Sequence, residues 1–208
     1  NHNLQLISEQ LKSKELRNIL VNLNYTKGKL VKKWKALDAR LTDALNEAKD
    51  NVKYLSVIEH FTEPLYHGTL WQQINDCIPN IMNNIKIMVQ ISRSYNTGDR
   101  VTTLLVKICN QIIKAATRIL TAPGLIWVQP HDELQSNLNS GIKTCELFRD
   151  QYKMLVSKVA HQGKGKSPEI NEASVFARLD MLCRRLGKLQ SLFTTIQQFS
   201  LLSRQNVD

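Results

Sequence analysis

Residues 175–196, VFARLDMLCRRLGKLQSLFTTI, decide the fold of this chain. Apolar side chains recur through this stretch in steps of 4, 3, 4, 3, 4 and 3, at Val175, Leu179, Leu182, Leu186, Leu189, Phe193 and Ile196. Alternating steps of 4 and 3 keep these side chains on one face of a helix for three heptads. Ser167 and Pro168, just ahead of the stretch, suit the start of a helix. The pattern predicts a long amphipathic helix that packs on other helices.

Four more stretches show helical spacing, at residues 30–55, 78–95, 101–119 and 134–159. The helix of the second stretch is expected to start at Pro79. The first of these contains two successive steps of 4, at Ala44, Ala48 and Val52, which resembles a stutter and predicts a straight seam. The first 23 residues favour two short helices that are broken near Ser13. Strand alternation is absent, except for the short apolar run before Pro130. The sequence therefore predicts an all-α fold.

Short turns at residues 96–99 and 121–124 favour antiparallel neighbours in an up-and-down arrangement. We expect elongated antiparallel bundles of long amphipathic helices. The N-terminal helices, one of them long, occupy residues 1–60, the central helices occupy 61–122, and a pair of long helices occupies 123–208. A flexible basic loop at 161–170 separates the last two helices.

Composition excludes several classes of protein. The 208 residues carry a formal net charge of +10, and 42% of them are hydrophobic, which is enough apolar content to oppose disorder. The longest apolar runs have about four residues, against the ~20 of a membrane span. The four cysteines, Cys77, Cys109, Cys145 and Cys183, lie at least 32 residues apart, which predicts reduced, mostly buried thiols rather than a zinc site or disulfides. Because the chain begins with Asn1 and not Met, we expect a segment of a longer protein.

No catalytic, cofactor or metal site is expected. Gly165-Lys166-Ser167 resembles the end of a phosphate-binding loop, but Ala160 replaces the glycine that this motif requires. The histidines are scattered without any metal-ligand spacing, at His2, His60, His67, His131 and His161. An enzyme is the interpretation that the residues support least.

Positive charge is concentrated in two regions. Residues 12–40 carry nine Lys and Arg against two acidic residues, and residues 143–188 carry ten against five. The candidate partner-binding residues are Lys29, Lys32, Lys33, Arg184, Arg185 and Lys188. Three interpretations stay open: a solvated helix face, a docking face for an acidic partner, and a nucleic-acid footprint. Nucleic acid is disfavoured because no stacking aromatic residues are interleaved with the charges. A generic helical tether or coiled-coil scaffold fits the composition as well.

Five passages, in order along the chain, match one family. They are DALNEAKDNVKYL at residues 43–55, FTEPLY at 61–66, ISRSYNTGDRVT at 91–102, KICNQI at 107–112, and VFARLD at 175–180 with Arg185-Leu186 and Gln198-Phe199. Together they resemble the N-terminal tail of dynein heavy chains. The passages at 91–102 and 107–112 are similar to the axonemal, outer-arm type. Leu182 stands where the family usually has Phe, a conservative departure.

The resemblance implies a non-catalytic part of a rod-like tail built of helical bundles, without cofactors, in a microtubule motor whose ATPase lies elsewhere. Tails of this family join neighbouring heavy chains and carry WD-repeat intermediate chains and light chains. They also anchor the motor to the axonemal doublet microtubule or its docking proteins. The implied location is cytoplasmic and cytoskeletal, in the axoneme of a cilium or flagellum, with no membrane or nucleic-acid partner. Within this assembly the segment would support docking and transmit force for ciliary motility.

Five residues are candidates for structural roles. Asp50 and Asn51 fall in the middle of a predicted helix, where both are poor helix formers, so we expect them to hydrogen-bond to a neighbouring helix end. Tyr95 and Asn96 belong to a predicted turn in which Asn96, Gly98 and Asp99 suit helix caps. Trp127, after Pro123-Gly124, is expected to anchor a stiff corner.

Overall fold

The computed structural model describes residues 2–25, 29–92, 94–122, 124, 126–162 and 168–205. These residues form helices and contain no β-strand, which confirms the predicted all-α class. The chain divides into two compact units, Asn1–Ser56 and Val57–Asp208. The three sequence segments 1–60, 61–122 and 123–208 describe helix patterning and stay a prediction.

The first unit consists of α1 (His2–Leu11), α2 (Lys14–Tyr25), α3 (Lys29–Asp50) and a π-helical turn, η1 (Asn51–Leu55). The predicted break near Ser13 is confirmed, and the Ser13 hydroxyl accepts a hydrogen bond of 3.4 Å from the Leu16 amide at the start of α2. Both short helices contact α3. Among the described side chains of this unit, the buried ones are Ser8 and Val31. Most of its apolar surface is therefore left open, for example at Leu6, Ile19, Val21, Leu30 and Leu37.

The π-helical turn begins at the end of the doubled step of 4, which runs from Ala44 to Val52. A π turn holds more residues than an α turn, because its hydrogen bonds join residues five apart. A π turn therefore takes one extra residue into the helix without ending it. The backbone stays helical on both sides, with φ −61° and ψ −40° at Asp50 and φ −64° and ψ −35° at Ser56. The Ser56 hydroxyl donates a hydrogen bond to the Val52 carbonyl within this segment.

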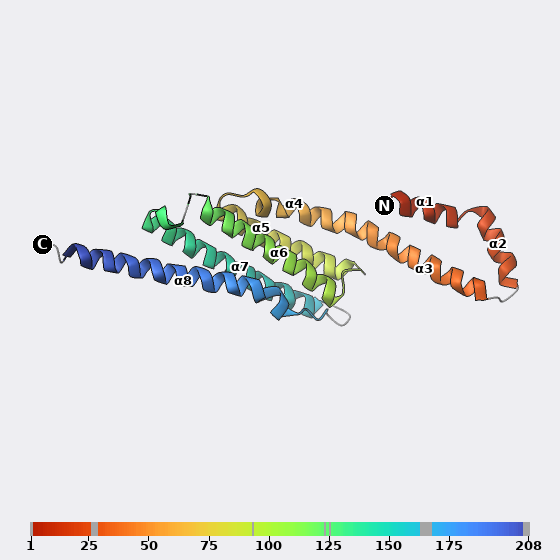
Figure 1. Cartoon of the computed structure of the whole chain (residues 1–208). Helices are drawn as coiled ribbons and strands as arrows, with labels where there is room; N and C mark the ends of the chain where they lie inside the picture. Colours follow the sequence, from red (N-terminus) through yellow and green to blue (C-terminus); the bar gives the residue numbers. More distant parts are fainter. Residues whose placement is uncertain are drawn as a thin grey trace. The chain divides into compact units, whose positions relative to one another are not determined.

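The second unit contains most of α4 (Ser56–His67) together with α5 (Trp71–Ile91), α6 (Gly98–Thr121), the 3₁₀ turn η2 (Ile126–Val128), α7 (His131–Gln162) and α8 (Glu172–Gln205). Consecutive helices from α5 to α8 run in alternating directions, as the short turns predict (Figure 1). The most extensive packing joins α5 to α7, α7 to α8, and α6 to α8. Two of these three pairs, α5 with α7 and α6 with α8, therefore join helices that run in the same direction.

Side-chain hydrogen bonds fix the register of the parallel pairs. Between α5 and α7, Trp71 Nε1 donates to Asn137 Oδ1 at 3.2 Å and Thr144 Oγ1 donates to Asn75 Oδ1 at 2.8 Å. Between α6 and α8, the Asn171 amide donates to Thr102 Oγ1, and Arg178 donates to Asn110 Oδ1, both at 3.1 Å. Residue numbers rise together in each pair, as parallel helices require.

The start of α5 differs from the expectation. The sequence predicts a helix from Pro79, whereas α5 begins at Trp71 and Pro79 lies inside it. The Gln73 side chain explains the earlier start, because its Oε1 accepts hydrogen bonds from the backbone amides of Thr69 and Leu70 at 2.9 and 3.2 Å. Proline has no backbone N–H, so Pro79 cannot donate a hydrogen bond within the helix. The two hydrogen bonds to Gln73 offset this loss.

Two further expectations concern loops. The apolar run before Pro130 forms the 3₁₀ turn η2 instead of a strand. Of the expected basic loop at 161–170, residues 163–167 lie outside the described part of the chain.

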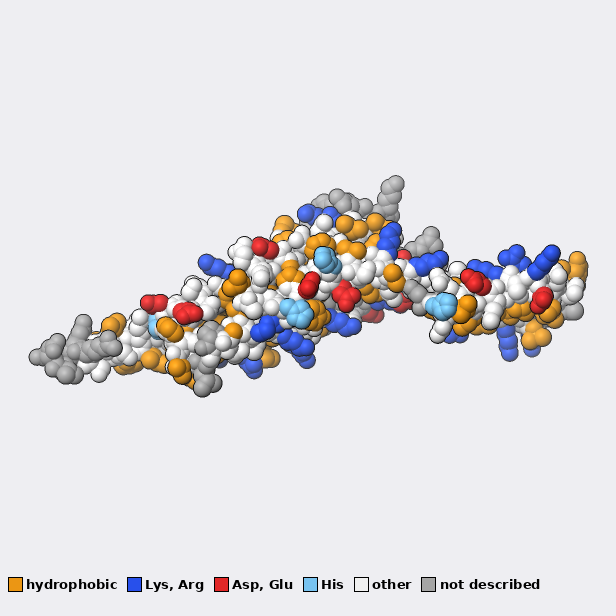
Figure 2. Space-filling model, turned by 90° about the horizontal axis from the view of Figure 1, so that it is seen from above, with side chains coloured by type: hydrophobic (Ala, Val, Ile, Leu, Met, Phe, Trp, Pro, Cys, Tyr) orange, Lys and Arg blue, Asp and Glu red, His pale blue; other side chains and the backbone are white. Residues whose placement is uncertain are grey.

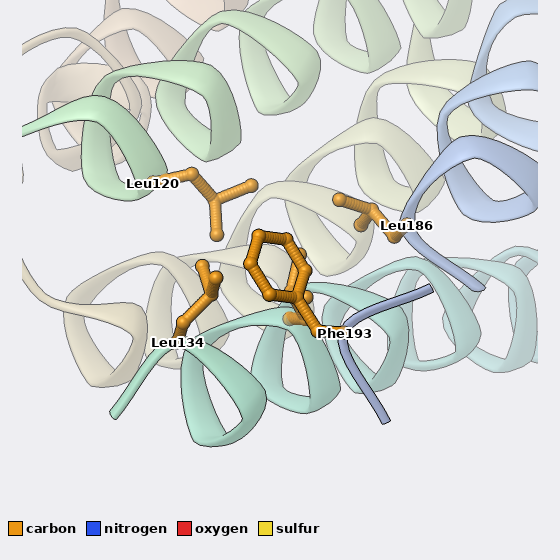
Figure 3. Packing of buried hydrophobic residues seen from close by; sticks show 5 residues of the cluster. Leu120, Leu134, Leu186 and Phe193 are labelled. Atoms are coloured by element: carbon orange, nitrogen blue, oxygen red, sulfur yellow. The ribbon is translucent and has the colours of Figure 1, made fainter. Parts of the chain in front are cut away.

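The heptad stretch of α8 forms the core with α6 and α7. Leu186 and Phe193 of α8 point toward Leu120 of α6 and Leu134 of α7 (Figure 3). Cys77, Cys109 and Cys145 are buried, Cys183 is half-buried, and all four thiols are free, as predicted.

Candidate functional site

The residues that the sequence singled out lie on helix surfaces and at joints between helices. In the described ranges, no cluster of three or more His, Cys, Asp and Glu side chains is placed to hold a metal ion. No helix in the described part of the chain combines the length and apolar character needed to cross a bilayer.

The first basic set, Lys29, Lys32 and Lys33, occupies the start of α3, and all three side chains are exposed. The first turn of α3 has no acidic residue. A helix N-terminus carries partial positive charge and favours anions, so three lysines there oppose the stability of the helix itself. An anionic group bound at this end would be attracted both by the lysines and by the helix dipole.

The second basic set, Arg184, Arg185 and Lys188, lies within little more than one turn of α8, and all three residues are exposed. Arg184 Nε donates a hydrogen bond of 3.3 Å to the Asp180 carbonyl of its own helix. The structure thus groups these three residues on one helix, while the first basic set belongs to the other compact unit.

A joint between α4 and α6 depends on Arg118, which the sequence did not single out. Arg118 donates hydrogen bonds to the carbonyl of Gly68 from Nε at 3.1 Å and from Nη2 at 2.7 Å, and to the carbonyl of Leu65 at 3.2 Å. Leu65 is fully buried. A Cβ on Gly68 would lie 2.4 Å from the Pro64 carbonyl, so this close approach requires glycine. The FTEPLY passage therefore lies at the C-terminal end of α4, where the Arg118 guanidinium donates hydrogen bonds to backbone carbonyls.

A second joint, between α7 and α8, is built around Phe176. Its ring packs edge-on against Tyr152, with centroids 5.0 Å apart, and against Phe148, with centroids 6.0 Å apart. The Arg149 guanidinium lies 4.5 Å from the centroid of the Phe176 ring and forms an ion pair with Asp180. Phe176 and Asp180 of the VFARLD passage thus contact α7 directly. The contacts of Arg149 and Tyr152 with Phe176 could not be found from the sequence, because Phe176 lies on another helix.

The turn between α5 and α6 packs against the segment before α8. Ser92 Oγ accepts hydrogen bonds from the amides of Ser94 and Tyr95 at 3.2 and 3.3 Å, and the Arg100 guanidinium lies 5.8 Å from the centroid of the Tyr95 ring. Asn96 is exposed, and Thr97 is the N-cap of α6 instead of Asn96, Gly98 or Asp99. Gly98 instead allows the backbone before α8 to approach closely, because a Cβ at this position would lie only 2.0 Å from the Glu169 carbonyl.

The remaining structural candidates lie at the π turn and at the corner after α6. Asp50 ends α3, and Asn51 begins the π turn; both are half-buried, and their hydrogen bonds to a neighbouring helix end stay a prediction. Trp127 is 66% exposed, although its ring centroid lies 5.5 Å from that of Phe193. Gln129 closes the corner by donating from Nε2 to the carbonyls of Leu120 and Gly124 at 3.0 and 3.1 Å.

The buried thiols have raised pKa values. Burial raises the pKa of Cys77 to about 11 and the pKa values of Cys109 and Cys145 to about 12 each. Because the thiolate is the reactive form, these three side chains remain neutral and unreactive near pH 7.

Comparison with known proteins identifies close relatives. The family model described as Dynein heavy chain, N-terminal region 1, matches residues 1–207. The chain is 36% identical over 202 residues to the Dynein gamma chain, flagellar outer arm, of Chlamydomonas reinhardtii, which covers 97% of this chain and 4% of that one. It is 35% identical to Dynein axonemal heavy chain 5 of Rattus norvegicus, over 96% of this chain and 6% of that one. Dynein axonemal heavy chain 8 of Homo sapiens is 32% identical, over 97% and 4%.

Proposed function

Because the chain belongs to the family Dynein heavy chain, N-terminal region 1, we propose that it is a non-catalytic segment of an axonemal dynein heavy-chain tail. One observation carries the proposal. The similarity extends through nearly the whole chain, and the relatives cited above are named as flagellar outer-arm or axonemal chains. Because the chain belongs to this family, the alternative of a helical scaffold unrelated to motors is excluded. The chain spans only 4–6% of the length of these relatives, so the ATPase belongs to other parts of the parent protein.

Within the tail, the second unit acts as a stiff mechanical element. Four long helices packed side by side resist bending better than single helices joined by loops. The Arg118 hydrogen bonds and the Phe176 aromatic contacts support this role, because each ties together segments from different helices. Force from the motor then passes through packed helices to the anchored end of the tail.

The two basic sets dock other subunits of the motor. The partners are a neighbouring heavy chain, WD-repeat intermediate chains and light chains. Through the assembled tail, the segment contributes to attachment on the doublet microtubule or its docking proteins in a cilium or flagellum. Exposure of all six basic side chains supports this assignment. Exposed ion pairs contribute only about 0–1 kcal/mol each, so apolar contacts must add to the affinity.

The experiment is a charge reversal in the full heavy chain. The variant Lys32→Glu with Lys33→Glu is assembled into the motor, and the co-purifying subunits are quantified by mass spectrometry. We expect the yield of at least one intermediate or light chain to fall. A matched control, Lys107→Glu with Lys114→Glu, makes the same change in charge at two exposed positions of α6 and should leave the yields unchanged. Circular dichroism of the variants checks that the helices persist. Equal yields from the two variants would refute docking through this set.

A further inference from the structure

Helix α8 carries two heptad-spaced lines of side chains. The inner line packs into the core from Val175 to Phe193, whereas Ile196 at its end is 46% exposed. A second line, shifted by one residue, steps by 4, 3, 4, 3, 4 and 3 along the helix. We call it the outer seam: Met181, Arg185, Lys188, Leu192, Thr195, Phe199 and Leu202, all of which are exposed.

The apolar members of the outer seam are strongly exposed for their size. Met181 is 48% exposed, Leu192 44%, Phe199 68% and Leu202 54%. A surface helix of a globular protein usually has one apolar stripe, whereas a helix that is apolar on several sides is normally buried on those sides. Regular heptad spacing is the pattern that packs a helix against another helix. The outer seam therefore has the form of a helix–helix contact that lacks its second helix.

The seam also extends beyond the bundle. His131, the first residue of α7, contacts the carbonyl of Phe193 through Nε2 at 3.2 Å. The later turns of α8 continue past this end of α7 (Figure 1). Hydrophobic side chains reach the surface at this end of α8 (Figure 2). The outer seam thus runs from the side of the bundle onto its projecting end.

Charge selects the kind of helix that fits. Arg185 and Lys188 lie between Met181 and Leu192 along the seam, and Arg184 adjoins them. A second copy of this helix would bring cations against cations in this region. Membrane-bound helices separate their basic residues from the apolar face, whereas the outer seam places them in the same line. An acidic amphipathic helix satisfies both the apolar and the charged positions.

We propose that the outer seam of α8 binds an amphipathic helix of another motor subunit, one that presents an apolar ridge flanked by Asp and Glu. This inference rests on the proposed docking function and assigns it a surface and a partner chemistry. The apolar ends of the seam supply buried area, and the central cations set the register and orientation of the partner helix.

Photo-crosslinking in the assembled motor tests the proposal. The photoreactive amino acid benzoylphenylalanine replaces Leu192 or Phe199 of the full heavy chain, and linked peptides are sequenced by mass spectrometry. We expect both positions to capture one segment of another subunit, with acidic residues three or four positions from the linked side chain. The same probe at Lys107, an exposed position on α6, should give at least ~10-fold less of this product. Capture of a second copy of α8, of another segment of the same heavy chain, of a segment without acidic residues, or of no protein would overturn the proposal.

A charge-reversal arm tests the role of the cations. Adding Arg185→Glu and Lys188→Glu to the Phe199 probe should lower the crosslink yield about tenfold, because like charges then face each other. Co-sedimentation of the 208-residue chain with phosphatidylserine vesicles at 0.15 M salt should give no binding. An unchanged crosslink yield, or vesicle binding that these two substitutions abolish, would overturn the proposal.

The two proposals fail differently. If the outer seam captures nothing while Lys32→Glu with Lys33→Glu still releases a subunit, the docking function stands and the outer seam is the wrong surface. If neither experiment has an effect, the docking function itself is refuted.

Discussion

Arg118 donates two hydrogen bonds to the carbonyl of Gly68, 50 residues earlier in the chain, at 3.1 and 2.7 Å. A third bond from the same guanidinium reaches Leu65. The last carbonyls of a helix have no partners within the helix, and here a side chain of α6 supplies them for α4. Through Leu65, the contact ties the FTEPLY passage to a residue of α6 that lies outside the passages of the family resemblance.

Replacing Arg118 with Gln should lower the free energy of unfolding by about 1–3 kcal/mol, because buried carbonyls lose charged donors. Urea denaturation of the 208-residue chain measures this change. Lys107→Gln, on an exposed face of the same helix, should change stability by less than about 0.5 kcal/mol. Equal midpoints for the two variants would show that the joint contributes nothing.

Two glycine substitutions should have opposite effects. Gly98→Ala places a Cβ 2.0 Å from the Glu169 carbonyl, so the turn must shift and the melting temperature should fall. Gly187→Ala adds a Cβ that meets no other atom within 4 Å inside α8, and better helix propensity should stabilise the protein by about 0.5–1 kcal/mol. Thermal unfolding followed by circular dichroism compares them. An unchanged melting temperature for Gly98→Ala would contradict the close approach at Gly98, and a fall for Gly187→Ala would contradict the open space beside Gly187.

The joint at Phe176 should depend on aromatic packing more than on its ion pair. Phe176→Ala removes a buried ring and should cost about 3–5 kcal/mol. Asp180→Asn breaks a partly exposed ion pair with Arg149 and should cost only about 0–1 kcal/mol. Chemical denaturation distinguishes the two, and a larger loss from Asp180→Asn would reverse this order.

Alkaline pH should destabilise the second unit through its buried thiols. The folded-state pKa values of Cys109 and Cys145 are raised to about 12, so above about pH 9 the unfolded chain releases protons that the folded chain retains. Their contribution to stability is complete below pH 9 and is lost as the pH rises toward 12. Burial also raises the pKa of Tyr152, which adds a loss in the same direction above pH 10.

The thiol contribution is isolated by Cys109→Ala with Cys145→Ala. Each buried thiol steepens the fall in stability by up to about 1.4 kcal/mol per pH unit, so the double variant should show a shallower slope between pH 9 and 11. Urea denaturation across this range measures the slopes. Parallel slopes for the variant and the original chain would contradict the assignment.

Local spacing was enough to predict most of the helices, although α4 lies in none of the stretches with helical spacing. The 4 and 3 steps of residues 175–196 correspond to α8, and the five-residue step from Leu11 to Leu16 corresponds to the break between α1 and α2. These features depend on side chains that lie close together in sequence, so periodicity records them. The predicted start of α5 at Pro79 is wrong because α5 begins at Trp71, where Gln73 accepts hydrogen bonds from amides three and four residues earlier.

The joints could not be predicted from spacing. Arg118, Arg149 and Gly98 act on partners 27 to 71 residues away, and the sequence does not specify which helices become neighbours. The most extensive packing includes the parallel pairs α5 with α7 and α6 with α8, although consecutive helices are antiparallel. The candidate basic residues could be found from the sequence, because Lys and Arg side chains are mostly exposed.

Crosslinking mass spectrometry of the intact axonemal motor tests the central claim, that this segment docks other subunits, most directly. A lysine-reactive reagent is applied to the assembled complex, and products at Lys29, Lys32, Lys33 and Lys188 are compared with those at Lys107 and Lys114. The account predicts that the first four lysines link to intermediate chains, light chains or a neighbouring heavy chain, while the two control lysines link only within their own chain. Intersubunit products confined to the control lysines, or absent from all six, would contradict it.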